Sequence, residues 1–231
     1  HLGRTYADRA MSDSKFTQMG ISQLQKRVLK RHPWLVLAAL RGTRYARRTH
    51  FEYEMQKAVK GQSCCFSMSY LYPLIRDFKP EVVVETGVRT GGSTTFILRA
   101  LHDNQKGNLY SIDLPNTNPS DQEMQLPKGT YTGFYVDQFP ELKDRWELIL
   151  GDAKVELPKL VMILDHIDVF HHDSDHSYQH MTFEFETVWP KLRKGGLLLA
   201  DDVDRHKAFA DFCYRMGISC IIKGEKGSAK K

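Results

Sequence analysis

The 231-residue sequence has few cysteines and no long apolar run, and each absence excludes a class of protein. Its four cysteines are Cys64, Cys65, Cys213 and Cys220, and the adjacent pair suits neither an ordinary disulfide nor the spacing of zinc ligands. A disulfide-rich miniprotein is therefore excluded, and we expect buried, reduced thiols and a cytoplasmic protein. The longest stretch without a polar residue, 34–40, is far shorter than the roughly 20 residues of a membrane-spanning helix, so no transmembrane segment is expected.

The charge is divided unevenly along the chain. Residues 1–60 carry 13 basic and 4 acidic side chains, a net +9, whereas residues 61–231 carry 20 basic and 24 acidic ones, a net −4. The overall net charge of +5, taken alone, suggests a nucleic-acid partner. Its division predicts instead a basic, mostly helical N-terminal extension (1–60) on an acidic domain (61–231). We expect the extension to be a lid over a site or a contact in a homo-oligomer, with an anionic ligand or a membrane surface as less favoured alternatives.

From residue 82 onward, short apolar segments alternate with stretches typical of helices. Strands are predicted at 82–86, 108–113, 146–151, 167–172, 196–200 and 218–222. Helices are predicted at 92–103, 139–144, 154–161, 177–193 and 205–216. The apolar runs 82–84 and 197–199 lack polar alternation, as strands buried on both faces do. The pattern predicts an α/β fold with a doubly wound, mainly parallel sheet.

A glycine-rich turn follows the first predicted strand. Residues 85–93 read E-T-G-V-R-T-G-G-S, with Glu85, Gly87, Gly91 and Ser93 ahead of a helix. Ligands of parallel sheets bind at the carboxyl ends of the strands, where glycine lets the backbone approach them and helix amides face them. The spacing is not the G-x-G-x-x-G of dinucleotide binders, and it lacks the Lys-Ser/Thr of a P-loop. The alternative is a purely structural turn between a strand and a helix.

The next two strand ends carry acidic side chains that suit a nucleoside. Asp113 closes the second strand, where a carboxylate can accept both hydroxyls of a ribose. Asp152 and Ala153 follow the third strand, and an acidic side chain beside a small one can border an adenine. Each of these positions is weak evidence when taken alone.

The fourth and fifth strand ends are the most acidic. Asp173 and Asp175 follow the fourth strand, and Asp201 and Asp202 follow the fifth. Carboxylates brought to one rim repel one another unless a cation lies between them. Their oxygens favour Mg²⁺, Ca²⁺ or Mn²⁺ over zinc. The structural alternative for Asp201 and Asp202 is the N-cap of a helix.

Histidines are concentrated in the same region, with five of the ten between residues 166 and 180. His172, His176 and His180 are four residues apart, which on one helix would suit zinc, but His172 is expected to lie in a strand and the site is disfavoured. His176 is a candidate general base because the ordinary pKa of an imidazole lies near neutral pH. The alternative is that His176 only forms a hydrogen bond near the site.

These motifs, in this order, resemble the class I S-adenosylmethionine-dependent methyltransferases. More narrowly, they are similar to the divalent-cation-dependent small-molecule O-methyltransferases of the catechol, caffeoyl-CoA and macrocin types, and to the cephalosporin-hydroxylase-like branch of the fold. Residues 173–178, D-S-D-H-S-Y, resemble the D-G-D-H-S-Y of bacterial members. Residues 197–203, L-L-L-A-D-D-V, resemble the L-L-A-D-N-V that follows the fifth strand in the catechol type. The resemblance covers residues 62–222.

The resemblance implies a role for each group of residues. The methionine part of S-adenosylmethionine would be held by Glu85, Gly87, Gly91 and Ser93. Its ribose would be held by Asp113, and its adenine would be flanked by Asp152 and Ala153. Mg²⁺, or another hard divalent cation, would be bound by Asp173, Asp201 and Asp202. The usual base of the family is a lysine three positions after the first metal-binding aspartate; here that position is His176, and Asp175 is the competing candidate.

The implied activity is methyl transfer to a hydroxyl of a small molecule (a sugar, a catechol or a natural product) with Mg²⁺ assistance. The alternatives are a nucleic-acid methyltransferase that uses the basic extension, and a non-catalytic S-adenosylmethionine-binding protein. No N/D-P-P-Y/F motif for binding a base amide follows the fourth strand, so nucleic acid is not the expected partner. The long loop 114–138 contains Tyr131, Phe134 and Tyr135, which are expected to close over the acceptor.

The C-terminus departs from the family pattern. Sheets of this family end in a hairpin whose last strand is antiparallel, but residues 223–228 read K-G-E-K-G-S, which is not a strand pattern. The last strand is therefore expected to be missing, which would leave a sheet edge exposed.

Overall fold

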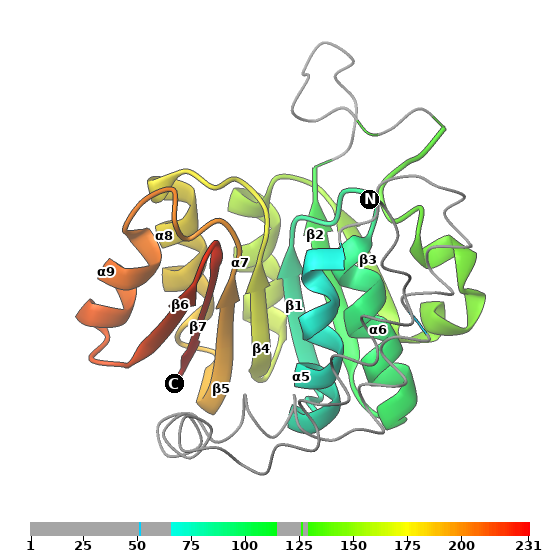
Figure 1. The fold of residues 1–231 in the computed structure, drawn as a ribbon, viewed down its shortest axis with the longest axis horizontal. Coiled ribbons are helices and arrows are strands. Elements are labelled where there is room, and N and C mark those ends of the chain that lie inside the picture. The colour runs from blue at the N-terminus through cyan, green and yellow to red at the C-terminus, as the bar shows by residue number, and fades with distance from the viewer. Residues whose placement is uncertain (1–50, 52–65, 115–125, 127–128) are drawn as a thin grey trace, which may run out of the picture.

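The computed structural model describes residues 51, 66–114, 126 and 129–231 (Figure 1). The predicted N-terminal extension, apart from Phe51, lies outside the described residues, as does most of the first half of the predicted acceptor loop. The roles expected of the extension, as a lid or an oligomer contact, therefore stay predictions. Among the described helices, none is long and apolar enough to cross a bilayer.

The described chain alternates helices and strands, as predicted. The strands are β1 (Val82–Thr86), β2 (Asn108–Asp113), β3 (Trp146–Leu150), β4 (Ile167–His172), β5 (Leu192–Ala200), β6 (Cys220–Lys223) and β7 (Lys226–Lys230). The α-helices are α5 (Leu71–Phe78), α6 (Gly92–Asn104), α7 (Ala153–Ile163), α8 (Tyr178–Val188) and α9 (Ala208–Arg215). Three short 3₁₀ helices are η1 (Phe66–Tyr70), η2 (Val136–Gln138) and η3 (Pro140–Arg145).

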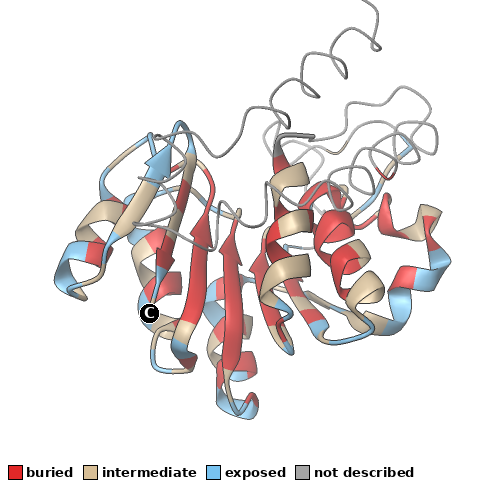
Figure 2. Ribbon diagram, turned by 60° about the horizontal axis from the view of Figure 1, so that its bottom comes forward, coloured by how far each residue is buried: buried red, intermediate tan, exposed pale blue. Residues whose placement is uncertain are grey.

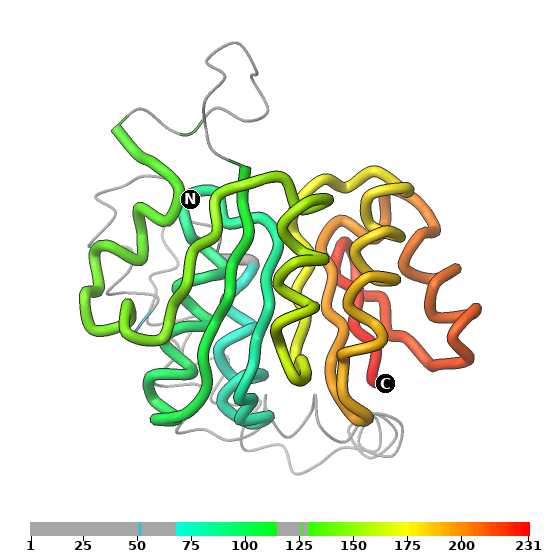
Figure 3. Tube along the Cα trace, turned by 180° about the vertical axis from the view of Figure 1, so that it is seen from behind, coloured from blue at the N-terminus to red at the C-terminus, as the bar shows by residue number. Residues whose placement is uncertain are grey.

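The strands form one sheet in the order β3-β2-β1-β4-β5-β7-β6. The neighbours from β3 to β5 pair in parallel, and β7 is antiparallel to both β5 and β6. Helices α5 and α6 cover one face (Figure 1), and α7 and α8 cover the other (Figure 3). The predicted α/β class and mainly parallel sheet are confirmed.

The prediction that the last strand is missing was wrong. β7 pairs with β5 from Leu197↔Lys230 to Ala200↔Gly227, so the edge of β5 is covered by the C-terminal hairpin. The sequence K-G-S-A-K has little intrinsic preference for a strand, which is why the pattern did not show it. The overlooked signal is the turn: Lys223 pairs with Lys226, and Gly224, the first of two turn residues, has a φ of +59°, as in tight two-residue hairpins.

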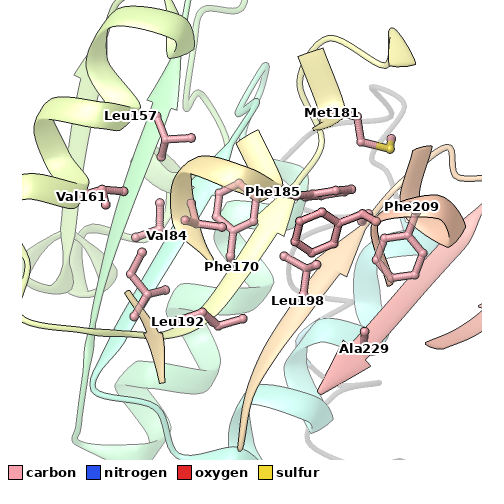
Figure 4. Packing of buried hydrophobic residues seen from close by; sticks show 14 of the residues in the cluster. Val84, Leu157, Val161, Phe170, Met181, Phe185, Leu192, Leu198, Phe209 and Ala229 are labelled. Carbon is pink, nitrogen blue, oxygen red and sulfur yellow. The ribbon is translucent and has the colours of Figure 1, made fainter. Parts of the chain in front are cut away.

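The central strands are buried because their successive side chains enter two different apolar clusters. Val83 and Val169 pack on the side of α5 and α6, whereas Val84, Phe170 and Leu198 pack against α7, α8 and α9 (Figure 4). All five side chains have an exposed fraction of 0%. The buried stripes along β1, β4 and β5 are visible in Figure 2. Uninterrupted apolar runs in these strands are thus explained by helices on both faces.

The carboxyl ends of β1 and β4 meet where the strand order reverses. The Asp173 amide donates a hydrogen bond to the Thr86 carbonyl at 2.8 Å. Gly87 follows with a φ of +84°, and a Cβ there would lie 2.0 Å from the Asp173 carbonyl oxygen. Only glycine avoids both the strained backbone and the clash. This contact places the glycine-rich turn beside the acidic end of β4, at the point where open α/β sheets bind ligands.

We expect Gly87→Ala to lower the free energy of unfolding by more than about 3 kcal/mol, because left-handed strain is added to a clash with backbone that cannot move aside. Chemical denaturation measures the loss. Gly217→Ala is the matched control, since Gly217 also has a positive φ, of +66°, but has nothing within 4 Å of the added Cβ. Its free energy of unfolding should fall only by the cost of the backbone strain, about 1–2 kcal/mol. Equal losses of stability in the two variants would show that the close contact with Asp173 adds nothing to the cost of a side chain at position 87.

Candidate functional site

A ring of hydroxyl groups holds Glu85 at the end of β1. The Ser93, Thr94 and Ser111 hydroxyls donate to its carboxylate at 2.6, 2.8 and 2.9 Å. Glu85 is fully buried, with an exposed fraction of 0%, and Ser93 is also buried. Glu85 therefore joins β1 to the first turn of α6 and to β2, and it fixes the path of the glycine-rich turn between them.

The glycine-rich turn, residues 87–92, is held from its other side by residues 133–135. The Gly133 amide donates to the Arg89 carbonyl, and the Tyr135 amide donates to the Thr90 carbonyl, both at 2.8 Å. Gly91 is the N-cap residue just before α6, with a φ of +90°, and no side chain caps this end of the helix. The start of α6 is thus rigidly placed, and its backbone amides are not used by a side-chain cap.

The aromatic residues expected over an acceptor have different environments. Tyr135 belongs to the apolar core, with an exposed fraction of 1%, so it cannot reach a ligand in this structure. Tyr131 is half exposed, and its hydroxyl donates to Asp137. Its ring contacts Phe134 edge to face, with the ring centroids 5.5 Å apart.

Asp113 lies beside the glycine-rich turn, at the end of β2. Its carboxylate accepts hydrogen bonds from the Arg89 amide at 2.7 Å and from the Leu114 amide at 2.9 Å. Burial raises the pKa of Asp113 above its ordinary value, although the backbone hydrogen bonds act in the opposite direction. The site residues predicted after β1 and β2 are therefore brought together.

The residues predicted after β3 lie at the same edge of the sheet. The Gly151 amide donates to the Asp113 carbonyl at 2.8 Å. Asp152 is the N-cap of α7 and accepts from the Lys154 amide at 2.8 Å, and Ala153 is buried as the first residue of that helix. Asp152 thus has a local structural role, in addition to its place beside the end of β2.

The carboxylates of Asp201, Asp202 and Glu225 form a cluster at the end of β5. Within the part of the chain that the structure describes, this is the group of three candidate ligands whose ligand atoms all lie within 4.8 Å of one another. Glu225 comes from the β6–β7 turn, in the segment 223–228 whose sequence shows no strand pattern. Asp173 is a neighbour of the cluster, since the Asp201 amide donates to the carbonyl of His172, the residue before Asp173, at 2.9 Å. Burial and then the charge of Asp201 raise the pKa of Asp173 well above its ordinary value. We call these four residues the acidic rim.

Among the described residues, a lysine and an arginine contact the acidic rim. Lys226 Nζ contacts Asp201 Oδ1 and lies 3.1 Å from Glu225 Oε1. Arg205 Nη2 lies 2.7 Å from Asp202 Oδ2. Burial would lower the pKa of Lys226, but its contacts with Asp201 and Glu225 outweigh it and raise that pKa. The negative charge of the rim is therefore partly compensated from within the chain.

His176, the predicted general base, lies at the acidic rim. Its Nε2 is 3.3 Å from Asp202 Oδ2 and 3.9 Å from Asp173 Oδ1. Burial, and then the neighbouring His172, lower the pKa of the imidazole despite the opposing effect of Asp202. A lowered pKa keeps the ring neutral, and so able to accept a proton, at neutral pH.

Asp175, the competing candidate for the base, has a different position. Its side chain is more than half exposed, and its carboxylate accepts from the Ser177 amide at 2.8 Å, just before α8. The geometry favours His176 over Asp175, because the imidazole lies 3.3 and 3.9 Å from two carboxylates of the rim, whereas Asp175 is exposed and bonded to the start of α8.

A buried carboxylate that the sequence did not reveal, Glu184, joins the ends of β1 and β4 next to the site. Glu184 of α8 accepts hydrogen bonds from the Thr86 hydroxyl at 2.6 Å and the Ser174 hydroxyl at 2.7 Å. Its carboxylate also pairs with His172 Nδ1 at 2.6 Å and His180 Nε2 at 2.8 Å. His172 and His180 thus share a carboxylate rather than the zinc site that their spacing superficially suggests. Only the His180–Glu184 spacing of four on one helix was readable in advance.

Glu184 makes the stability of the fold depend on pH. Burial alone would raise its pKa, but His172, His180 and Thr86 outweigh burial and lower the pKa to about 2, from an ordinary value of 4.5. A lowered pKa stabilises the folded state above pH 4.5, and that stabilisation disappears as the pH falls towards 2.

We expect Glu184→Gln to lower the free energy of unfolding at pH 7 by about 3 kcal/mol, and to flatten its decline between pH 5 and pH 2. Urea denaturation at several pH values measures both effects. Glu186→Gln is the control on the same helix, since Glu186 forms only an exposed ion pair with Arg215 at 2.7 Å. It should cost less than about 1 kcal/mol. A loss in Glu184→Gln that is the same at every pH would contradict the assignment.

Comparisons with known proteins agree with this arrangement. An O-methyltransferase from Bacillus cereus in complex with S-adenosylhomocysteine has a TM-score of 0.56 and 16% identity, with 98% of each chain covered. A Podospora anserina methyltransferase with S-adenosylhomocysteine bound has a TM-score of 0.55 and 13% identity, covering 100% of this chain and 98% of its own. A calicheamicin methyltransferase has a TM-score of 0.53 and 15% identity, covering 99% of this chain and 94% of its own. These likenesses concern the fold.

The family assignment comes from the sequence of the domain itself. None of the curated proteins compared with the chain matches its sequence. Residues 84–203 match a family model described as a methyltransferase domain. This segment is more than half of the chain, and it extends from β1 to the residue after Asp202. The chain therefore belongs to this methyltransferase domain family.

Proposed function

We propose that the protein transfers the methyl group of S-adenosylmethionine to a hydroxyl of a small molecule, assisted by a divalent cation at the acidic rim. The family model supports methyl transfer, and the solved structures of similar fold include an O-methyltransferase and a calicheamicin methyltransferase. The observation that carries the proposal is the meeting of the glycine-rich turn with the acidic rim at Gly87 and Asp173. A methyl donor and an acceptor bound at these two places would lie side by side.

The glycine-rich turn and its neighbours would bind the methyl donor. The uncapped start of α6 would face the carboxylate of the methionine part. Gly87 and Gly91 would act by letting the turn pack closely against residues 173 and 133. Glu85 and Ser93 would act mainly by fixing this turn, because they hydrogen bond to each other in the interior. The ribose hydroxyls would be accepted by Asp113. The adenine would be bordered by Asp152 and Ala153.

The acidic rim fits a hard divalent cation. It offers carboxylate oxygens from several strand ends. Burial, and then repulsion from Asp201, raise the pKa of Asp173, and a bound cation would offset both effects. We propose that the ion is held by Asp173, Asp201 and Asp202. When bound, it would lower the pKa of the acceptor hydroxyl.

His176 would be the general base. The methyl group of S-adenosylmethionine is already electrophilic on its sulfonium, so the protein must deprotonate and aim the hydroxyl. The neutral imidazole would take the proton at Nε2. Asp202 Oδ2, 3.3 Å from the same nitrogen, would stabilise the positive charge that forms there. Asp175 is the second candidate for this role.

A small-molecule acceptor is favoured over nucleic acid because the described rim is negatively charged, which repels phosphates. The basic residues that suggested nucleic acid belong to the extension, of which the structure describes only Phe51. Cytoplasmic location and a homo-oligomer remain part of the proposal.

Binding of the methyl donor is tested first, by calorimetry with S-adenosylmethionine and S-adenosylhomocysteine. We expect Asp113→Ala to weaken the binding of both about tenfold or more, because hydrogen bonds to a charged carboxylate are lost. Asp144→Ala, which removes an exposed carboxylate after Lys143, is the control and should leave the affinity unchanged. Absence of binding by the wild type at millimolar ligand would rule out the cofactor.

Transfer of a labelled methyl group to catechols and sugar diols, with and without EDTA, then tests the reaction and its metal requirement.

Replacing the base should affect turnover and leave binding intact. We expect His176→Gln to lower kcat about 100-fold or more, the usual contribution of a general base, without weakening the binding of S-adenosylhomocysteine. The pH dependence of kcat should also lose its acid limb, because that limb reports protonation of the imidazole. Asp175→Asn should change kcat only slightly. A threefold loss in His176→Gln, or a large loss in Asp175→Asn, would transfer the role away from His176.

A further inference from the structure

Lys226 occupies an unusual place for a lysine, because its ammonium group is directed into the acidic rim rather than towards water. It is the first residue of β7, and the pairing of Gly227 with Ala200 puts Lys226 beside Asp201. The Val203 amide donates to the Glu225 carbonyl at 2.9 Å, which fixes the turn before Lys226 to the segment after β5. The Lys226 side chain is only 18% exposed, and that of Asp201 only 11%.

We infer that Lys226 is a built-in counter-cation that competes with the divalent ion for Asp201. The inference rests on the metal part of the proposed function. Asp201 Oδ1 accepts from both the Lys226 ammonium and the Asp202 amide, so an ion bound through this oxygen has to displace Lys226. Two cations this close would also repel each other. Binding of the ion through Oδ1 therefore displaces Lys226, and binding through the other oxygen of Asp201 is weakened by repulsion from the ammonium group.

Glu225 gives the displaced ammonium a second partner. Its Oε1 lies 3.1 Å from Lys226 Nζ, and its side chain is about half exposed, so it can follow the lysine outward. The exchange needs only side-chain rotation, because the backbone of the hairpin is held by its pairing with β5. Without the ion, Lys226 balances part of the charge of the rim; with the ion, the pair Lys226–Glu225 moves aside.

Lys223 offers a matched control within the same hairpin. It is the partner of Lys226 across the turn, carries the same charge and is exposed. Within the described part of the chain, Lys223 forms no ion pair with the rim. Removing its charge should change the general electrostatics of the hairpin without releasing Asp201.

The test is calorimetric titration of the full chain with MnCl₂, accompanied by thermal unfolding with and without the ion. We expect Lys226→Gln to bind Mn²⁺ about tenfold more tightly than the wild type, and Lys223→Gln to bind it within about threefold of the wild type. Lys226→Gln should also melt at a lower temperature than the wild type without metal, because the carboxylates lose their counter-charge. Mn²⁺ should raise its melting temperature more than that of the wild type.

Equal or weaker Mn²⁺ binding in Lys226→Gln would overturn the inference and leave the metal part of the proposed function standing. No binding in either protein would overturn both. Tight binding in Lys226→Gln with EDTA-resistant activity of the wild type would support the inference and refute metal assistance in the native enzyme.

A second variant covers the case in which Lys226→Gln does not fold. Lys226→Arg keeps the charge and pairs more strongly with carboxylates, so it should bind Mn²⁺ more weakly than the wild type. Binding as tight as in the wild type, or tighter, would contradict competition for Asp201.

Discussion

The close approach of the β1 and β4 ends is the constraint on which the rest of the site depends. A glycine at position 87 lets the backbone lie against the Asp173 carbonyl, and the amide of Asp173 returns a hydrogen bond to Thr86. The two strands belong to different halves of the sheet, on either side of its switch point. One contact between backbones therefore fixes the distance between the glycine-rich turn and the acidic rim, whichever ligands they hold.

Two buried carboxylates stabilise this meeting point without facing the ligand side. Glu85 is surrounded by hydroxyl donors, and Glu184 by hydroxyl and imidazole groups, so both satisfy the requirement that buried charge be hydrogen bonded. Asp113 and Asp173 are instead partly exposed at the edge of the sheet, and burial raises the pKa of each above its ordinary value. The distinction separates acids that build the scaffold from acids that are candidates for binding.

The acidic rim is balanced by the side chains of the same chain. Lys226 on Asp201 and Arg205 on Asp202 supply positive charge from two different segments, the last hairpin and the turn after β5. The C-terminal hairpin thus does two things at once: it covers the edge of β5, and it carries Glu225 and Lys226 to the rim. The proposed charge exchange at Asp201 would link the binding of an ion to the outermost strands of the sheet.

The sequence by itself determined the class of fold and the identity of most candidate residues. Runs such as 82–84 specify strands through apolar β-branched side chains, and the glycine spacing and the aspartates after the strands follow directly from the chain. It could not specify β7, because K-G-S-A-K becomes a strand through the hydrogen bonds that β5 offers. Nor could it specify the partners of Glu184 or the position of Lys226. Those depend on the register between segments far apart in the chain, which only tertiary structure decides, since pairing of backbones is indifferent to most side chains.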